Sequence, residues 1–402
     1  MKTQTLLSVT SLLSLLATAP ACSDDTTPDS GTGGGGGAAA DLSAMPQVAE
    51  NYADIVLASY RDALSAAQDL DAAVDAFVAE PSEEALAAAR LAWKASRPPY
   101  LQTEVFRFYD GPIDDPEDGP EGLLNAWPLD ENYIDYTVDA PDSGIVNDAT
   151  QEITAEALLG LNEQGGEKNI ATGYHAVEFL LWGQDLSTDG PGARPFTDYT
   201  TADNADRRAE YLQVVTGLIV DELSGLVDAW ELDQDNYRKA FLAEAPEEQL
   251  RRILTGMITL SGFETGGERL QTAYDTRDQE DEHSCFSDNT HVDMIEDVRG
   301  IQNVYLGQYQ TLAGETVGDV DASVRALIES HDAELADELT ARIAESLTLA
   351  EDLEVPFDQG IVSGNDEGRA KVAALIDSLR AKQEKLLEQG FRDFGLAIPA
   401  PE

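Results

Sequence analysis

The sequence predicts an all-α fold of two antiparallel helix bundles with an irregular Pro/Gly-rich excursion. Three observations predict it. Apolar residues recur every three or four positions through most of the chain after residue 40. Short alternating runs with β-branched residues, the mark of strands, are nearly absent. Between Asp110 and Asp148 the helical pattern stops and prolines and glycines punctuate the sequence. Two bundles, with this segment between paired helices, are the simplest architecture that accommodates the pattern.

The first 22 residues have the pattern of a bacterial lipoprotein signal peptide. A short basic start precedes an apolar run, Leu6 to Ala17, which is too short to span a bilayer. Small residues lead from Ala19 to Cys22, so we expect export and a lipid on Cys22. An ordinary secretory signal cleaved near Ala21 is the alternative. Ser23 favours the outer membrane of a Gram-negative host, with the protein anchored in the cell envelope on the periplasmic side.

A Gly/Ser-rich linker, residues 23–40, connects this signal to a domain that spans residues 41–402. The chain has 25 Lys and Arg against 77 Asp and Glu, a net charge of −52. Such a charge repels nucleic acid and anionic lipid, so we expect no nucleic-acid partner and a membrane contact through the lipid alone. With Cys22 acylated, Cys285 has no disulfide partner in the chain, and the fold depends on its hydrophobic core.

Helical segments follow in order along the domain. The first is long, and Pro81 with the acidic Glu83 and Glu84 then marks a stop and a new helix start. This second helix is expected to end near Arg97, because Pro98-Pro99 should break it, before a short helical piece at 101–108. The stripe of the first helix is Val48, Tyr52, Ile55, Ser59, Ala63, Ala66, Leu70, Val74 and Phe77. Further helices are expected at 154–161, 173–182, 211–230, 246–274, 297–312, 322–353 and 366–389.

One of these helices carries a histidine and a carboxylate that could share a metal ion. His175 and Glu178 are three residues apart and lie on the same helix face. An imidazole beside a carboxylate supplies half of the kind of site that helical bundles use for iron and manganese. Gly173 and Gly183 indicate a close backbone approach or helix termini. The alternative is a histidine that is simply hydrogen-bonded within a helix interface.

A denser polar cluster lies at residues 280–291, with His283, His291, four carboxylates and Cys285. It could contribute to the same site. The alternative is a polar loop in which residues 288–290 cap the next helix. Cys285 is expected to be a buried small side chain, because no basic residue adjoins it to lower its pKa.

Two further groups of charged residues are candidates. Glu104 and Arg107 are spaced for a helical ion pair, but Glu104 or Asp114 could instead reach the cavity that contains His175. Glu264 lies among glycines within a helical pattern. Each such glycine costs about 1 kcal/mol relative to alanine, which indicates close packing or a ligand.

Taken together, these motifs resemble the imelysin-like family, also called peptidase family M75, in its iron-regulated protein A branch. The residues that carry the resemblance are Gly173-x-His175-x-x-Glu178, residues 104–108 with 111–114, residues 125–131 with 133–136, and residues 282–291. The resemblance covers most of residues 41–402. It implies two helical bundles, a metal or ligand site near the His-x-x-Glu helix, and an association with iron acquisition.

We therefore expect an exported, lipid-anchored protein that binds iron or another divalent metal as part of iron uptake, together with iron-transport components. The expected ligands are His175, Glu178, Glu104 and Asp114; the expected supporting residues are Gly173, Arg107, Glu264, His283 and His291. Carboxylates with imidazoles suit iron without excluding zinc or manganese. A zinc metallopeptidase is a rival, although catalytic zinc needs three protein ligands and a general base. Binding of haem or another organic metal chelate is a third possibility.

Overall fold

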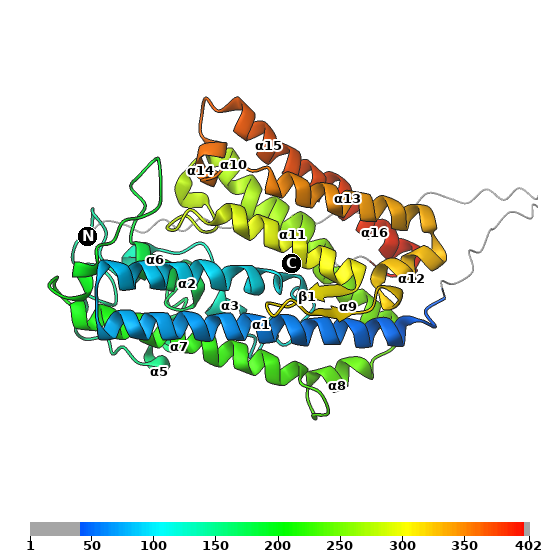
Figure 1. The fold of residues 1–402 in the computed structure, drawn as a ribbon, viewed down its shortest axis with the longest axis horizontal. Coiled ribbons are helices and arrows are strands. Elements are labelled where there is room, and N and C mark those ends of the chain that lie inside the picture. Colours follow the sequence, from blue (N-terminus) through cyan, green and yellow to red (C-terminus); the bar gives the residue numbers. More distant parts are fainter. Residues whose placement is uncertain (1–40, 398–402) are drawn as a thin grey trace, which may run out of the picture. The chain divides into compact units, whose positions relative to one another are not determined.

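A computed structural model describes residues 41–397, and within this range nearly all regular structure is helical (Figure 1). The predicted fold class is therefore confirmed. The predicted signal peptide with Cys22 and the linker, residues 1–40, lie outside the described residues. None of the helices described in 41–397 is long and apolar enough to cross a membrane.

The first bundle consists of α1 (Met45–Ala79), α2 (Glu83–Leu101), α6 (Gly173–Trp182) and α7 (Ala205–Trp230). Helix α1 packs against α2 and α7, and α6 packs against the same two helices (Figure 1). Every position of the predicted stripe on α1 is buried, because this face lies between two neighbouring helices.

Helix α2 begins as expected but does not end at Arg97. Ser82 caps it by accepting a hydrogen bond from the backbone N–H of Ala85 at 3.1 Å. The helix then continues through Pro98 and Pro99 to Leu101. Both prolines fall in the last turn and lack the N–H groups that would donate to residues 94 and 95, but this final turn is buried, and its packing offsets the lost hydrogen bonds.

The excursion between α2 and α6 is packed rather than extended. It contains the 3₁₀ turn η1 (Glu104–Phe106) and three short helices: α3 (Glu121–Leu124), α4 (Glu131–Ile134) and α5 (Ala155–Leu161). Helix α3 contacts α6 and α7, and α5 contacts α7. The excursion thereby covers one side of α6.

The second bundle contains two long helices that are each interrupted by a π-helical segment. One runs through α9 (Pro246–Thr259), η3 (Leu260–Gln271) and α10 (Thr272–Thr276); the other runs through α15 (Asp366–Ile376), η6 (Asp377–Gln383) and α16 (Glu384–Asp393). The two π-helical segments pack against each other. Helices α11 (Thr290–Leu306) and α13 (Ala333–Glu351) complete the bundle.

Two predicted helix boundaries in this bundle are wrong. Helix α11 begins before the predicted residue 297. It also ends before residue 312, because Gly307 adopts a left-handed conformation with φ of 68° and a short hairpin follows. The predicted helix 322–353 is two helices, α12 (Val324–His331) and α13. Asp332 separates them by accepting hydrogen bonds from the first N–H groups of α13.

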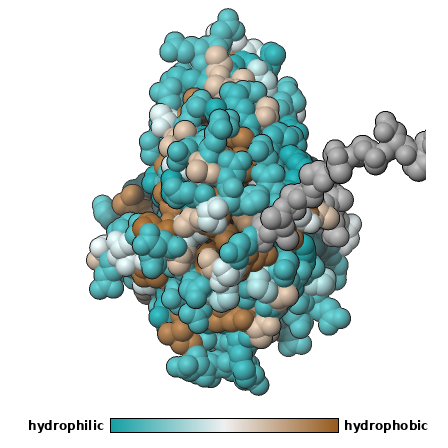
Figure 2. All heavy atoms as spheres, turned by 90° about the vertical axis from the view of Figure 1, so that its right-hand side faces the viewer, coloured by the Kyte–Doolittle hydropathy of each residue, from teal (hydrophilic) through white to brown (hydrophobic). Residues whose placement is uncertain are grey.

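The remaining elements are short. They are η2 (Phe196–Tyr199), α8 (Tyr237–Leu242), η4 (Gln279–Asp281), β1 (Gln308–Gln310), β2 (Thr316–Gly318), η5 (Val320–Ala322) and α14 (Phe357–Ile361). Strands β1 and β2 pair antiparallel, with Tyr309 opposite Val317. One large hydrophobic core extends through the first bundle into the second, and a smaller core fills the second bundle between α10, α11, α13 and α15. The face in Figure 2 is largely hydrophilic, as the acidic composition leads one to expect.

Candidate metal centre

Helix α6 is buried along its whole length, and a glycine allows it to start where it does. Gly173 has φ of 87°, and a Cβ atom there would lie 2.6 Å from the carbonyl oxygen of Leu124 at the end of α3. A side chain at this position would therefore force α3 and α6 apart. The predicted close approach at Gly173 is confirmed, and it places His175 and Glu178 inside the protein.

His175 and Glu178 contact each other directly. The Nδ1 atom of His175 lies 3.0 Å from Oε2 of Glu178. The other carboxylate oxygen of Glu178 accepts hydrogen bonds from the backbone N–H and the hydroxyl of Ser287, at 2.9 and 2.7 Å. Both Glu178 oxygens are thus engaged, whereas Nε2 of His175 is buried without a hydrogen-bond partner.

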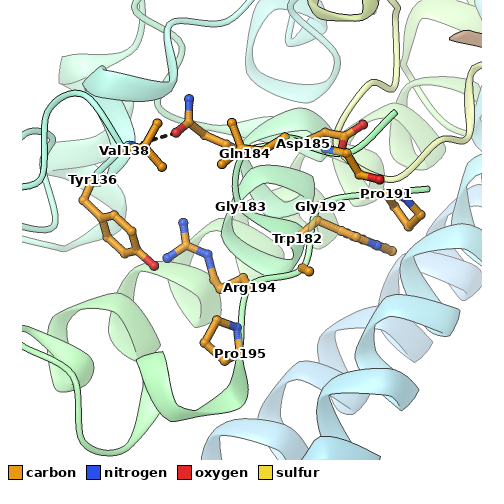
Figure 3. A pocket seen from close by; sticks show the side chains of 13 residues that line it. Tyr136, Val138, Trp182, Gly183, Gln184, Asp185, Pro191, Gly192, Arg194 and Pro195 are labelled. Carbon is orange, nitrogen blue, oxygen red and sulfur yellow. Dashed lines mark hydrogen bonds between the residues drawn. The ribbon is translucent and has the colours of Figure 1, made fainter. Parts of the chain in front are cut away.

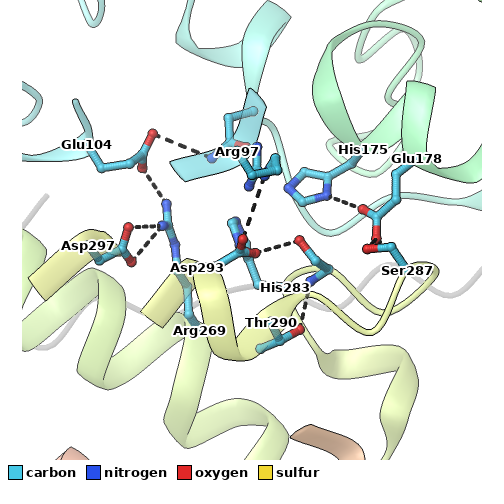
Figure 4. A network of polar contacts seen from close by, with 12 residues as sticks. Arg97, Glu104, His175, Glu178, Arg269, His283, Ser287, Thr290, Asp293 and Asp297 are labelled. Atoms are coloured by element: carbon cyan, nitrogen blue, oxygen red, sulfur yellow. Dashed lines mark hydrogen bonds and ion pairs between the residues drawn. The ribbon is translucent and has the colours of Figure 1, made fainter. Parts of the chain in front are cut away.

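A second histidine lies beside the first with a matching arrangement (Figure 4). The ring centroids of His175 and His283 are 4.7 Å apart, at an interplanar angle of 75°. Nδ1 of His283 lies 2.7 Å from Oδ2 of Asp293, which also accepts a hydrogen bond from Ser284. Each imidazole therefore has its Nδ1 held by a buried carboxylate.

The protonation of this group is governed by burial. Burial lowers the pKa of His175 well below its ordinary value, and the neighbouring His283 and Arg97 add to the effect. The pKa of His283 is lowered in the same way by burial and by Arg269 and Arg97, so both imidazoles are neutral at neutral pH. Burial raises the pKa of Glu178 to about 8, although the Ser287 hydrogen bonds oppose the change. Burial therefore favours the neutral forms of both groups near neutral pH, with one proton between Nδ1 of His175 and Oε2 of Glu178 and the second on Nε2 of the imidazole.

Charged residues next to the histidines form a connected network (Figure 4). Arg97, at 0% exposure, donates to Asn125 at 2.8 Å and lies 3.7 Å from Asp293. Asn125 in turn lies 3.5 Å from Oε1 of Glu104. The network thus runs from the two histidines to Glu104 on η1.

Glu104 is the meeting point of two guanidinium groups. Arg107 donates to it at 2.6 Å, and Arg269 from η3 donates to the same oxygen. Arg269 also binds Asp297 at 2.8 Å and Glu264 at 3.1 Å. Burial opposes ionisation of Glu104, but Arg107 and Arg269 together hold its pKa well below the ordinary value. For Asp297, burial prevails over Arg269 and the pKa is raised.

A cavity of about 510 Å³ opens beside this network. His283, Trp127 and Arg269 line its inner part, and most of the other charged residues along its wall are acidic. These acidic residues are Glu121, Glu163, Glu167, Glu264, Glu268 and Asp281. The ring of Trp127 also packs on His175, with centroids 5.1 Å apart. His175 does not line the cavity itself, but it contacts Trp127 and His283, which do.

The structure brings together some of the residues predicted for the site and separates others. His175, Glu178, His283, Glu104, Arg107 and Glu264 belong to one network or line its cavity. Asp114 does not join them, because its carboxylate accepts hydrogen bonds from the backbone of residues 108, 109 and 111. His291 is partly buried in the first turn of α11 and makes no hydrogen bond to either histidine.

Sequence reasoning missed several members of the network. Asp293, Ser287, Arg97, Arg269 and Asp297 were not among the predicted site residues. Asp293 lies ten residues after His283 and Ser287 is 109 residues from Glu178, so neither pair has the regular spacing of one helix. The dense polar segment 280–291 was the available signal, and the expected helix cap within it is wrong in part. Asn289 is the N-cap of α11 but makes no side-chain capping bond.

Four buried acidic residues, two of them on the loop that carries His283, influence one another electrostatically. Glu282, Asp288, Asp185 and Asp358 are all buried. Burial, with repulsion from Asp185 and Asp358, raises the pKa of Asp288 to about 7. Asp185 also lines a separate cavity of about 420 Å³ at the end of α6 (Figure 3). Arg194, which lines the same cavity, is paired with Asp135 and Asp198. Cys285 is buried, as predicted.

No three histidine, cysteine, aspartate or glutamate side chains within residues 41–397 are arranged to hold a metal ion on their own. The site as described offers two neutral imidazoles beside a charged cavity. A metal ion bound at these imidazoles would need further ligands from outside the described side chains.

Comparisons with known proteins agree with the helical fold described above. The family profile of imelysin, peptidase family M75, matches residues 56–386. Iron-regulated protein A of Synechococcus elongatus is 24% identical over 340 residues, which cover 82% of this chain and 80% of that protein. A crystal structure assigned as an iron-regulated protein A precursor from Parabacteroides distasonis has a TM-score of 0.69 at 22% identity, covering 89% of this chain and 97% of that one. An imelysin-like protein from Psychrobacter arcticum has a TM-score of 0.63 at 14% identity, covering 90% and 100%. Because the family profile spans well over half of the sequence, this chain belongs to the imelysin family, peptidase family M75.

Proposed function

We propose that this protein binds iron or another divalent metal ion between His175 and His283, as a step of iron uptake. The observation that carries the proposal is the Nε2 atom of His175, which is fully buried and has no hydrogen-bond partner. A buried polar atom without a partner is costly, and a neutral imidazole nitrogen is a common metal ligand. Nδ1 of His283 is held by Asp293, so its Nε2 is the nitrogen that remains for a ligand in the cavity.

The carboxylates next to the histidines fit the role of orienting groups. Metal-binding histidines typically donate their second ring N–H to a carboxylate, which fixes the tautomer and strengthens the ligand. Glu178 and Asp293 stand in this relation to His175 and His283. A cation at Nε2 would displace the proton from that nitrogen to solvent and favour the state in which Glu178 is ionised and the remaining proton lies on Nδ1 of His175. Glu178 thus acts by positioning His175, with its oxygens engaged by His175 and Ser287.

Two protein nitrogens leave most coordination positions of an iron ion to other ligands. Water or an organic chelator would supply them, and a cavity of about 510 Å³ has room for a small chelate. Binding of a metal chelate is therefore a second candidate. A zinc metallopeptidase would require a third protein ligand and a general base near the metal.

The relatives support the link to iron. The names of the Synechococcus and Parabacteroides proteins describe iron-regulated proteins. Within the proposal, the lipid on Cys22 holds the domain at the periplasmic side of the cell envelope, at the outer membrane in a Gram-negative host. There it would pass metal to iron-transport components.

Calorimetric titration of the metal-stripped full-length protein with Fe²⁺ under anaerobic conditions, and separately with Mn²⁺, tests the proposal. We expect one site that is lost in His175→Ala and in His283→Ala, whereas Asp114→Asn, which lies outside the site, leaves it intact. Unchanged stoichiometry and affinity in both histidine variants would refute the site.

The two forms of cargo are separated by a parallel titration with ferric citrate. Binding of the ferric chelate without binding of Fe²⁺ or Mn²⁺ identifies the chelate as the ligand. Chelator-sensitive cleavage of a denatured protein substrate, abolished by His175→Ala, would instead establish the peptidase.

A further inference from the structure

The cavity at the end of α6 has the size and walls of a site for a small organic molecule (Figure 3). It has a volume of about 420 Å³ and lies between the segment of Tyr136 and Val138 and the loop 182–195. Trp182, Leu186 and Val138 give it apolar walls, and Arg194 is the basic residue that lines it. Cavities of this size that combine apolar walls with a few fixed polar groups are the usual sites for small ligands.

Arg194 turns one edge of its guanidinium group to this cavity without a protein partner. The side chain is buried, at 5% exposure, and its Nη1 donates to Asp135 and Asp198 at 2.7 and 3.2 Å. Nε is buried without a hydrogen-bond partner among residues 41–397. The hydrogen bonds of this side chain within that range all come from Nη1, so Nη2 is also available. Nε and Nη2 lie side by side on the planar group and can donate in parallel to the two oxygens of one carboxylate.

The residue beside this edge is a glycine. A Cβ atom at Gly183 would lie 3.5 Å from Nε and 3.8 Å from Nη2 of Arg194, in contact with both. Because Gly183 has no side chain, the edge stays uncovered. Figure 3 shows the guanidinium group in the space between Tyr136 and Gly183.

Two further cations lie against the wall of the cavity. Cζ of Arg90 is 5.6 Å from the centroid of the Trp182 ring, and Nζ of Lys94 is 5.8 Å from it. Arg90 donates to the carbonyl oxygens of Leu181 and Arg194, and Lys94 donates to that of Ser287. Neutral groups therefore hold both cations, and their charge adds to a positive potential beside Trp182 that favours an anion.

The acids near Arg194 limit how much negative charge the ligand can carry. Asp135 and Asp198 already share the guanidinium group through Nη1. Asp185 lines the cavity as well, with Oδ1 accepting a hydrogen bond from the backbone N–H of Ser187 at 2.9 Å. A second charge on the ligand would be repelled by these carboxylates, so one carboxylate fits better than a phosphate dianion.

We propose that this cavity is a second ligand site, which binds a small monocarboxylic acid with a compact apolar body. The carboxylate accepts two hydrogen bonds from Nε and Nη2 of Arg194, and the apolar body packs between Trp182 and Leu186. Among residues 41–397, none lines both this cavity and the one beside His283. The site is therefore separate from the histidine site and needs no metal ion.

Benzoate is the probe, titrated by calorimetry at neutral pH into the full-length protein. We expect one benzoate site and a rise in the midpoint of thermal unfolding, because a ligand that binds only the folded state stabilises it. Benzylamine carries the same ring with the opposite charge, so it should not bind.

Two variants test the contacts of the carboxylate and of the apolar body. Arg194→Lys keeps a positive charge for Asp135 and Asp198 but loses the two parallel donors, and we expect the dissociation constant for benzoate to rise about tenfold or more. Leu186→Glu places a negative charge on an exposed residue of the wall and should raise it about fivefold or more. Leu312→Glu is the matched control, because Leu312 is similarly exposed, lies between β1 and β2 and lines none of the cavities described above. It should bind benzoate like the wild type.

If Arg194→Lys does not fold, the comparison of Leu186→Glu with Leu312→Glu decides, since both changes are at exposed positions. Absence of benzoate binding in the wild type, equal binding of benzylamine, or wild-type affinity in either folded site variant would overturn the proposal. His175→Ala should bind benzoate like the wild type, so this result does not depend on whether the histidine site binds metal.

Discussion

At the scale of single residues, the helix spacing of His175 and Glu178 was sufficient to predict their contact. Their positions on one helix face are fixed by local geometry, and the structure places Nδ1 of His175 next to Glu178. The partners of His283 could not be predicted in this way. Asp293 lies in the first turn of α11, and the loop before it is fixed to the first bundle by the hydrogen bond from Ser287 to Glu178. Local spacing therefore defined half of the site, and tertiary contacts supplied the rest.

Glu178→Gln provides a test of the orienting role. Ser287 donates two hydrogen bonds to one Glu178 oxygen, so the amide oxygen of glutamine should occupy that position and its NH₂ group should face His175. The amide would then donate to Nδ1 and place the ring proton on Nε2, which blocks metal binding. We expect the affinity for Fe²⁺ or Mn²⁺, measured by calorimetry, to fall about 10- to 100-fold.

Glu268→Gln is the control for that experiment, since Glu268 is an exposed residue on the wall of the same cavity. Its effect should be small. Equal affinities for the Glu178 variant and the wild type would show that Glu178 does not orient His175.

At the scale of elements, helices were predicted well where one face is continuously apolar and poorly where a tertiary contact sets the boundary. The predicted bounds of α6 agree with the structure. The π-helical segments η3 and η6 left no recognisable signal, because they pack against each other across about 120 residues of sequence, as the hydrogen bond from Ser261 to the Leu379 carbonyl shows. Arg269 lies on one of these segments, so its role in the site was equally hidden.

Glu104 links three elements, and its removal should weaken the fold. Through Arg269 it joins η1 to η3 and α11. Glu104→Gln leaves two buried guanidinium groups short of a counter-charge, and we expect a loss of about 3 kcal/mol in the free energy of unfolding, measured with urea. Glu248→Gln breaks a partly exposed pair with Arg251 and should cost about 0.5 kcal/mol or less.

The contribution of Glu104 to the free energy of unfolding should depend on pH with a definite sign. Because Arg107 and Arg269 hold the pKa of folded Glu104 below its unfolded value, its contribution is fully present above the unfolded pKa. It is lost as pH falls through the folded pKa. The difference in unfolding free energy between wild type and Glu104→Gln should therefore be constant above about pH 5 and shrink on further acidification. A difference that is independent of pH would contradict the assignment.

At the scale of the whole molecule, the composition predicted the charge of the surface but not where acids are buried. The net charge of −52 repels itself across the folded domain. Screening by salt should relieve this repulsion, so we expect the thermal unfolding midpoint to rise when NaCl is increased to about 0.5 M, where the Debye length is only a few Å. Calorimetric scans at a series of salt concentrations would measure it. A falling midpoint would mean that the described ion pairs outweigh the general repulsion.

The burial of His175 behind Trp127 and His283 bears on kinetics as well as on affinity. A ligand that reaches Nε2 of His175 from the cavity must first displace the ring of Trp127 or the loop that carries His283. Under the proposed function, the rate of capture is then limited by how often these side chains open, whereas the rate of release depends on this opening and on the strength of the metal–nitrogen bonds. Within the proposed function, we therefore expect a partner that moves this loop to speed the release of the bound metal.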